Sequence, residues 1–216
     1  MHIPSIFAED NIDTIIDFIA ENPLATLVAQ TPNGIEACHI PLFWHNENHD
    51  SDKANGYLYG HFGRKNPIYQ TALSNTSWLI IFQDSGHYIS PNWYPTKAKT
   101  HKEVPTWNYQ SIHIHSQIEL IEDMNTLKWL LSKLTKQQEV ISDNPWSLDD
   151  APKAYIDAMC RAIIGFKLTI ESIQAQYKLS QNKTVENVEG VINGLGKLNT
   201  SRAKSMASKV DKHSNH

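Results

Sequence analysis

The chain has 216 residues, of which 40% are apolar and 19% charged, and its formal net charge is −4. This length supports a full hydrophobic core, and the acidic balance excludes a protein that coats nucleic acid with its whole surface. No stretch approaches the roughly 18 uninterrupted apolar residues of a membrane span. The amino terminus lacks the basic and apolar segments of a signal peptide, so we expect a cytoplasmic protein without membrane contact. Cys38 and Cys160 are too few for a disulfide framework.

The beginning of the chain predicts a helix followed by a β-hairpin. The apolar face of the helix consists of isoleucines at helical spacing: Ile12, Ile15, Ile16 and Ile19. Asp10 or Asn11 can cap it. Residues 24–30 and 35–44 read as two strands joined by an Asn-Gly turn. Pro41 cannot donate to a sheet ladder, so the second strand should be broken there or lie at an edge.

The stretch from Gly60 to Pro67 is the strongest local signal for a ligand. Residues 57–62 alternate as a strand that breaks at Gly63 into Arg64, Lys65 and the predicted first turn of a helix. Free backbone N–H groups, a guanidinium fork and an ammonium together suit a phosphate group. The alternative interpretation is that both cations are solvated charges at a surface turn.

Three further strands are predicted in the middle of the chain. Residues 78–82 form a nearly continuous apolar run, typical of a buried strand, and residues 87–90 form a short strand. The proline-bounded segment 96–105 is interpreted as a lid. Residues 107–121 alternate in polarity and predict a long strand. Its core face carries Ile112, Ile114, Ile118 and Leu120.

Two helices and a last strand follow. A helix from Asp123 should bury four leucines: Leu127, Leu130, Leu131 and Leu134. Pro152 opens a second helix that extends to about Arg161, and residues 164–170 alternate as the last strand. Six or seven strands with inserted helices predict a mainly β, α+β fold. A closed or split antiparallel barrel is favoured, because the regular strand–helix alternation of a doubly wound sheet is absent.

Residues 183–216 are predicted to form a segment separate from a domain spanning residues 1–182. An apolar stripe predicts a helix, although three glycines weaken it; the stripe is Val185, Val188, Ile192 and Leu195. From Asn199 onward we expect the tail to fray. Between residues 183 and 212 the sequence has six basic and three acidic residues. This segment is therefore a candidate for weak contact with DNA phosphates.

Five motifs together resemble one family, the PaiB-type proteins, described as FMN-binding negative transcriptional regulators. The motifs are GHFGRKNP (60–67), YISPNWY (88–94), VPTWNY (104–109), IHIH (112–115) and KLSQN (178–182). The resemblance implies an FMN-binding split barrel that forms a homodimer with the flavin at the subunit interface. It also implies kinship in fold with pyridoxamine phosphate oxidases and small flavin reductases.

The resemblance also implies which residues bind FMN. Oxidase-like relatives hold the phosphate with a Ser-Arg-Lys element, and Gly63, Arg64 and Lys65 stand in its place here. The serine hydroxyl is missing, and the N–H of Gly63 is a substitute donor. His61 and Phe62 flank this site, but only one of two neighbours on a strand can face the cofactor. The backbone of four residues would run along the isoalloxazine edge: His39, Ile40, Pro41 and Leu42.

Trp107 and Asn108 are two further candidates for flavin contact, through stacking and an amide hydrogen bond. Equally, Trp107 is a candidate plug for the barrel end. His113 and His115 share a strand face, with His61 as a conceivable third metal ligand, but no cysteine or carboxylate with matching spacing accompanies them. We therefore expect no metal and interpret the histidine pair as polar residues at a dimer face or near the flavin.

Three functions remain open from the sequence. The first is an FMN-binding dimeric repressor of transcription, and the second is an FMN-dependent oxidoreductase of the pyridoxamine phosphate oxidase or flavin reductase kind. The third is a flavin-free interaction module. No general acid, general base or nucleophile stands out, so we name no catalytic residue.

Overall fold

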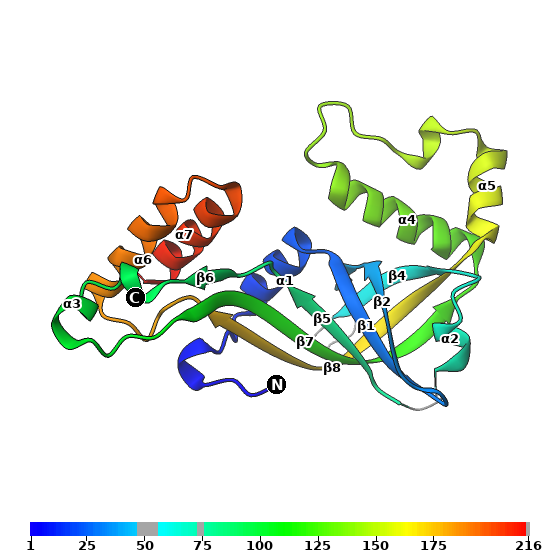
Figure 1. The fold of residues 1–216 in the computed structure, drawn as a ribbon. Helices are drawn as coiled ribbons and strands as arrows, with labels where there is room; N and C mark the ends of the chain where they lie inside the picture. The colour runs from blue at the N-terminus through cyan, green and yellow to red at the C-terminus, as the bar shows by residue number, and fades with distance from the viewer. Residues whose placement is uncertain (47–55, 73–75, 215–216) are drawn as a thin grey trace. The chain divides into compact units, whose positions relative to one another are not determined.

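The computed structural model describes residues 1–46, 56–72 and 76–214 (Figure 1). The chain forms two compact units, each assembled from separate stretches of sequence. Unit 1 is made of the described parts of Met1–Asp10, Gln83–Ile112 and Gln174–His216, and unit 2 of those of Asn11–Phe82 and His113–Ile173. Among these residues, no helix is both long enough and apolar enough to cross a membrane.

The described strands form one antiparallel sheet. They are β1 (Leu24–Thr31), β2 (Gly34–Pro41), β3 (Phe43–His45), β4 (Tyr57–Gly63), β5 (Trp78–Gln83), β6 (His87–Ile89), β7 (Thr106–Ile121) and β8 (Ile163–Lys178). The strand order is β2-β1-β5-β7-β8-β4-β3, and β6 pairs with β7. This path does not return on itself within the part described. The predicted α+β fold with predominant strands is confirmed, in its split rather than its closed form.

The helices divide between the two units. Unit 2 contains α1 (Ile12–Glu21), α2 (Ile68–Thr71), α4 (Met124–Glu139), η3 (Leu148–Asp150) and α5 (Lys153–Arg161). Unit 1 contains η1 (Ser5–Phe7), η2 (Pro91–Trp93), α3 (Lys97–Thr100), α6 (Val185–Lys197) and α7 (Ser201–Ser214). In Figure 1, α6 and α7 lie side by side as the orange and red helices at the end of the chain.

The predicted hairpin is confirmed by the pairing of β1 with β2. Leu24 faces Pro41 at one end of the ladder and Thr31 faces Gly34 at the other. Gly34 has a φ of +117°, which a residue with a side chain rarely adopts. As Pro41 requires, β2 ends at this residue and β2 begins the strand path at an edge of the sheet.

The long strand β7 departs from the predicted core pattern toward its end. Ile112 and Ile114 are fully buried as expected, whereas Ile118 is half-buried and Leu120 is exposed. Ser111, which the alternation of a strand places on the opposite face, is also buried. The middle of β7 is therefore covered on both faces, while its last residues extend beyond that cover. Alternation of side chains is a property of the strand, but burial depends on what packs above each face.

The prediction that the chain frays from Asn199 is wrong, because residues 201–214 form the helix α7. Three small or apolar side chains at helical spacing are buried: Ala203, Met206 and Val210. Arg202 Nε donates to the carbonyl oxygen of Gly86 at 2.7 Å, and Lys209 Nζ lies 2.7 Å from a carboxylate oxygen of Asp84. A stretch rich in lysine and serine with so few apolar residues has the composition of a solvated tail. The few apolar side chains nevertheless suffice to pack this helix against the rest of unit 1.

Two glycines of α6 allow close approach of Trp93 in η2. A Cβ at Gly190 would collide with the carbonyl oxygen of Trp93, and one at Gly194 would collide with its ring. A Cβ at Gly196 would meet no atom within 4 Å. Two of the three glycines that weaken the helix in the sequence thus have a packing role in the structure.

We expect Gly194→Ala to destabilise the protein by about 1–3 kcal/mol through overpacking, although alanine is the better helix former. Gly196→Ala is the matched control and should stabilise the protein by up to about 1 kcal/mol, because only helix propensity changes there. Urea unfolding of the two variants measures both effects. A stabilising Gly194→Ala would show that Trp93 does not pack against α6.

Candidate functional site

The turn after β4 is well defined by backbone hydrogen bonds. Gly63 pairs with Ile163 of β8, and the N–H of Arg64 donates to the carbonyl oxygen of Ala162 at 2.9 Å. The N–H of Asn66 closes the turn by donating to the carbonyl oxygen of Gly63 at 2.9 Å. The bond from Arg64 makes Gly63 and Ile163 a non-hydrogen-bonded pair, so the N–H of Gly63 points away from β8. That N–H is therefore not used in the pairing with β8.

Arg64 and Lys65 are exposed cations at this turn. Arg64 Nε donates to the carbonyl oxygen of Arg161 at 3.0 Å, which fixes the side-chain direction. Over residues 1–46, 56–72 and 76–214, neither the outer guanidinium nitrogens of Arg64 nor the ammonium of Lys65 has a partner. A Cβ at Gly63 would meet nothing within 4 Å, so the space beside the turn is open. The arrangement offers donors to an anion without requiring any existing ion pair to break.

The helix that follows the turn is shorter than the phosphate hypothesis assumes. α2 has four residues, and Asn66 Oδ1 already accepts from the N–H of Ile68 at 3.1 Å. A single capped turn has almost no macrodipole, because the dipole sums over aligned peptide units. Side chains and the turn backbone therefore supply the donors, and a helix terminus does not.

His61 and Phe62 face opposite sides of β4, as neighbours on a strand must. Phe62 is fully buried, with its ring centroid 4.4 Å from that of Phe166 and 5.5 Å from that of Tyr69. It is a core residue. Nδ1 of His61 is buried and has no hydrogen-bond partner in the described chain. Burial lowers the pKa of this imidazole, which favours the neutral form with an unfilled hydrogen-bonding position.

The end of β2 lies beside the same turn. The thiol of Cys38 hydrogen-bonds to the side chain of Asn66, and burial raises the pKa of that thiol. A Cβ at Gly60 of β4 would collide with Leu42, which directly follows β2, so the chain after β2 lies against β4. The structure therefore brings the predicted segment His39–Leu42 close to the turn after β4. His39 and Pro41 are exposed, while Ile40 and Leu42 are buried.

Sequence reasoning missed how Arg64, Cys38 and Asn66 are held. The acceptor that orients Arg64 is a main-chain carbonyl on a distant residue, which leaves no trace in residue type. Asn66 is different, because an Asn side chain commonly accepts from the backbone N–H two residues further on, which is a recognisable turn signal.

Trp107 and Asn108 belong to unit 1, whereas the other predicted cofactor residues belong to unit 2. The amide of Asn108 is fully buried and makes two hydrogen bonds with the hydroxyl of Ser180, at 2.9 and 3.2 Å. The ring of Trp107 is half exposed, with the guanidinium carbon of Arg202 6.0 Å from its centroid. Asn108 therefore has a structural role within its own unit, and the exposure of Trp107 does not fit a buried plug.

The histidine pair on β7 does not gather further ligands. Within the described ranges, no group of three or more histidine, cysteine or acidic side chains is positioned to hold a metal ion. His113 is half-buried and His115 exposed. Burial lowers the pKa of His113, so it is a neutral polar residue on the strand.

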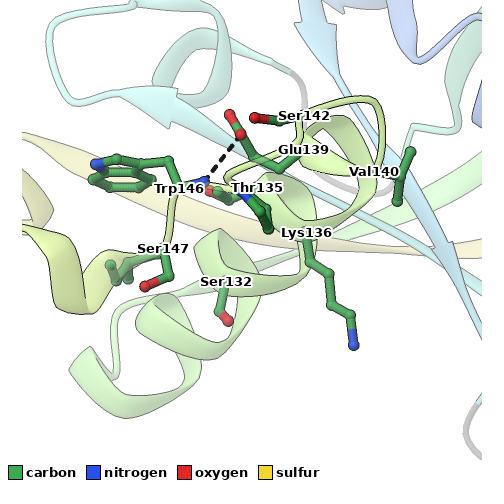
Figure 2. Close-up of a pocket in the computed structure, with 10 residues that line it drawn as sticks. Ser132, Thr135, Lys136, Glu139, Val140, Ser142, Trp146 and Ser147 are labelled. Carbon is green, nitrogen blue, oxygen red and sulfur yellow. Dashed lines mark hydrogen bonds between the residues drawn. The ribbon is translucent and has the colours of Figure 1, made fainter.

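A separate cavity of about 380 Å³ lies in unit 2, between the end of α4 and the loop that leads to η3 (Figure 2). Glu139 lines this cavity, and its side chain accepts a hydrogen bond from the backbone N–H of Trp146 at 3.0 Å, drawn as the dashed line. None of the predicted site residues lines it. Among the described residues, no buried polar side-chain atom without a hydrogen-bond partner belongs to this lining.

The turn after β4 fits the phosphate end of FMN. It combines unpaired cationic donors at Arg64 and Lys65, an outward N–H at Gly63 and an unfilled imidazole nitrogen at His61. Hydrogen bonds from charged donors to phosphate are short and strong. The turn thus offers several donors that suit a phosphate group, although it lacks the serine hydroxyl.

Comparison with known proteins identifies the family of the chain. The family model described as "Putative FMN-binding domain" matches residues 1–172. The "Protease synthase and sporulation protein PAI 2" of Bacillus subtilis is 32% identical over 207 residues, which is 96% of this chain and 95% of that protein.

Solved structures with little sequence identity share the fold. A conserved hypothetical protein of Mycobacterium tuberculosis, Rv2991, has a TM-score of 0.58 at 10% identity, covering 85% of this chain and 94% of its own. The flavocytochrome Anf3 of Azotobacter vinelandii has a TM-score of 0.55 at 13% identity, covering 82% and 72%. Together with the sheet topology and the family match, these likenesses identify the split barrel, and FMN is the cofactor of the matched domain. The chain therefore belongs to the PaiB-type family of FMN-binding split-barrel proteins.

Proposed function

We propose that the protein binds FMN through the turn after β4 and acts, as a homodimer, as an FMN-dependent negative regulator of transcription. The observation that carries the proposal is the pair of unpaired cations Arg64 and Lys65 beside the open Gly63. In this proposal Arg64 and Lys65 hold the phosphate, while His61 donates to or accepts from the ribityl chain. The exposed backbone at His39 and Pro41 borders the ring. When bound, FMN would supply electron or hydride transfer.

The regulatory part of the proposal is supported by the family membership and by the similarity to the PAI 2 protein. The C-terminal basic segment contributes less to DNA contact than its sequence suggests. Three of its six basic residues are engaged within unit 1: Lys183 with Glu103, Arg202 with Gly86, and Lys209 with Asp84. Lys197, Lys204 and Lys212 are exposed and remain available for phosphates.

Direct DNA binding should therefore be weak and only moderately dependent on salt. With three phosphate contacts per protomer, we expect log K to fall with log salt at a slope of roughly −3 per protomer. A gel-shift titration of the FMN-loaded protein on its own promoter fragment, at several salt concentrations, measures this slope. Absence of retardation at low salt would contradict direct repression through this segment.

An FMN-dependent oxidoreductase is the competing function, and the same purified protein distinguishes the two. Steady oxidation of NADH or NADPH by the FMN-loaded protein, lost in Arg64→Ala, would favour the enzyme. DNA retardation that requires FMN, without turnover of either nucleotide, would favour the regulator. Light scattering during gel filtration tests the dimer independently of both.

A further inference from the structure

Three of the five sequence motifs meet at one cavity that the FMN proposal does not use. The cavity has a volume of about 270 Å³ and lies within unit 1. Motif 88–94 contributes Tyr94, motif 104–109 contributes Thr106 and Asn108, and motif 178–182 contributes Lys178 and Ser180. Three segments that are distant in sequence thus contribute polar residues to the lining of one small cavity.

Tyr94 carries an unfilled hydrogen-bonding group in this region. Its side chain is 2% exposed, and its hydroxyl has no hydrogen-bond partner in the described chain. The ammonium of Lys183 lies 4.6 Å from the ring centroid, over its face. A buried hydroxyl without a partner costs free energy, which a bound acceptor would relieve. Burial raises the pKa of Tyr94 further above neutrality, so the hydroxyl keeps its proton.

The charged side chains that line the cavity favour a ligand with a single negative charge. Lys183 is neutralised by Glu103, whose carboxylate oxygen lies 2.7 Å from its ammonium nitrogen. This bond, together with those from Thr96 and Asn187, holds the pKa of Glu103 below its ordinary value. Lys178 Nζ donates to the hydroxyl of Thr106 at 2.7 Å but pairs with no carboxylate among the residues described. One uncompensated ammonium therefore remains.

Three apolar side chains also line the cavity. They belong to Phe7, Val104 and Pro105, and none of them carries a charge. A phosphate dianion would leave one negative charge unbalanced and would not use these side chains. A carboxylate attached to an apolar body balances the charge of Lys178 and removes apolar surface from water.

We propose that this cavity is a second ligand site, separate from the FMN turn, which binds a small monocarboxylate with an apolar body. The carboxylate accepts hydrogen bonds from Lys178 Nζ and from the hydroxyl of Tyr94, and the apolar body contacts Phe7 and Pro105. The site requires neither FMN nor DNA.

Calorimetric titration of the full chain, without FMN, tests the site with benzoate as the probe. Benzamide is its neutral isostere, and inorganic phosphate is the competing anion. We expect benzoate to bind at least tenfold more tightly than either, because a hydrogen bond between charged partners is lost with benzamide. Equal binding of benzamide, preference for phosphate, or no binding of benzoate would each overturn the proposal. Displacement of benzoate by FMN would overturn the separation of the two sites.

Two variants locate the binding. Lys178→Met should weaken benzoate about 10- to 100-fold. Tyr94→Phe should weaken it severalfold while leaving the thermal unfolding temperature of the free protein unchanged or higher, because an unpaired buried hydroxyl is removed. Tyr88→Phe, at an exposed tyrosine of the same motif, is the control and should change neither quantity. A Tyr94→Phe variant that loses stability but binds benzoate normally would show that the hydroxyl has a structural role instead.

Discussion

Arg64→Ala is expected to lower the affinity for FMN by about 10- to 100-fold. Arg64 is the one residue of the turn that offers two unpaired, planar donors in an orientation fixed by the protein, through Nε and the carbonyl oxygen of Arg161. Hydrogen bonds to charged groups contribute about 1.5–3 kcal/mol, which sets this range. Fluorescence titration of FMN measures it directly.

The neighbouring substitutions sharpen this test. Arg64→Lys keeps the charge but loses the fork, so its affinity should lie between those of wild type and Arg64→Ala. Lys133→Ala removes an exposed charge from α4 and serves as the control, with FMN affinity unchanged. If Arg64→Ala and Lys133→Ala bind FMN equally well, the phosphate is held elsewhere.

Asp84→Ala should lower the free energy of unfolding by about 3–5 kcal/mol. The Asp84 side chain is 7% exposed, and its carboxylate has three partners in unit 1. Oδ1 accepts from the N–H groups of Gly86 and Gln110 at 3.0 and 3.1 Å, and Oδ2 lies 2.7 Å from Lys209 Nζ. Removing the carboxylate breaks a partly buried ion pair and takes this acceptor from two backbone N–H groups, and the two losses together cost several kcal/mol, about as much as breaking a buried ion pair.

Asp84→Asn separates the two contributions, because it keeps an acceptor for the N–H groups and loses only the charge. Its loss of stability should be smaller than that of Asp84→Ala. Asp143→Ala, at an exposed loop residue, is the matched control and should have little effect. Urea unfolding with a loss below about 1 kcal/mol for Asp84→Ala would show that α7 is not docked through this pair.

Patterns of adjacent residues in the sequence predicted those features of the fold that depend on adjacent residues alone. The hairpin, the cap of α1 by Asn11 and the break at Pro41 depend on a few adjacent residues, and each is confirmed. The helix α7 could not be predicted in the same way, because its stability depends on buried contacts and on pairs such as Lys209 with Asp84, 125 residues away.

In the candidate site, too, adjacent residues allowed some predictions, while contacts between distant residues decided the rest. The sequence identified Arg64 and Lys65 as the cations of the turn, but it could not choose between His61 and Phe62, because alternation alone does not reveal which face is the core. The packing of Phe62 against Phe166 makes that choice. The sequence offered Asn108 as a flavin contact but could not show that its amide bonds to Ser180, which lies in a different motif.

The central claim is that this chain holds FMN at the turn after β4. The most direct measurement is the visible absorption spectrum of the purified protein after incubation with FMN and gel filtration, beside Arg64→Ala treated identically. We expect flavin to elute with the wild-type protein and to be largely lost from the variant. Elution of the wild-type protein without flavin would contradict the claim.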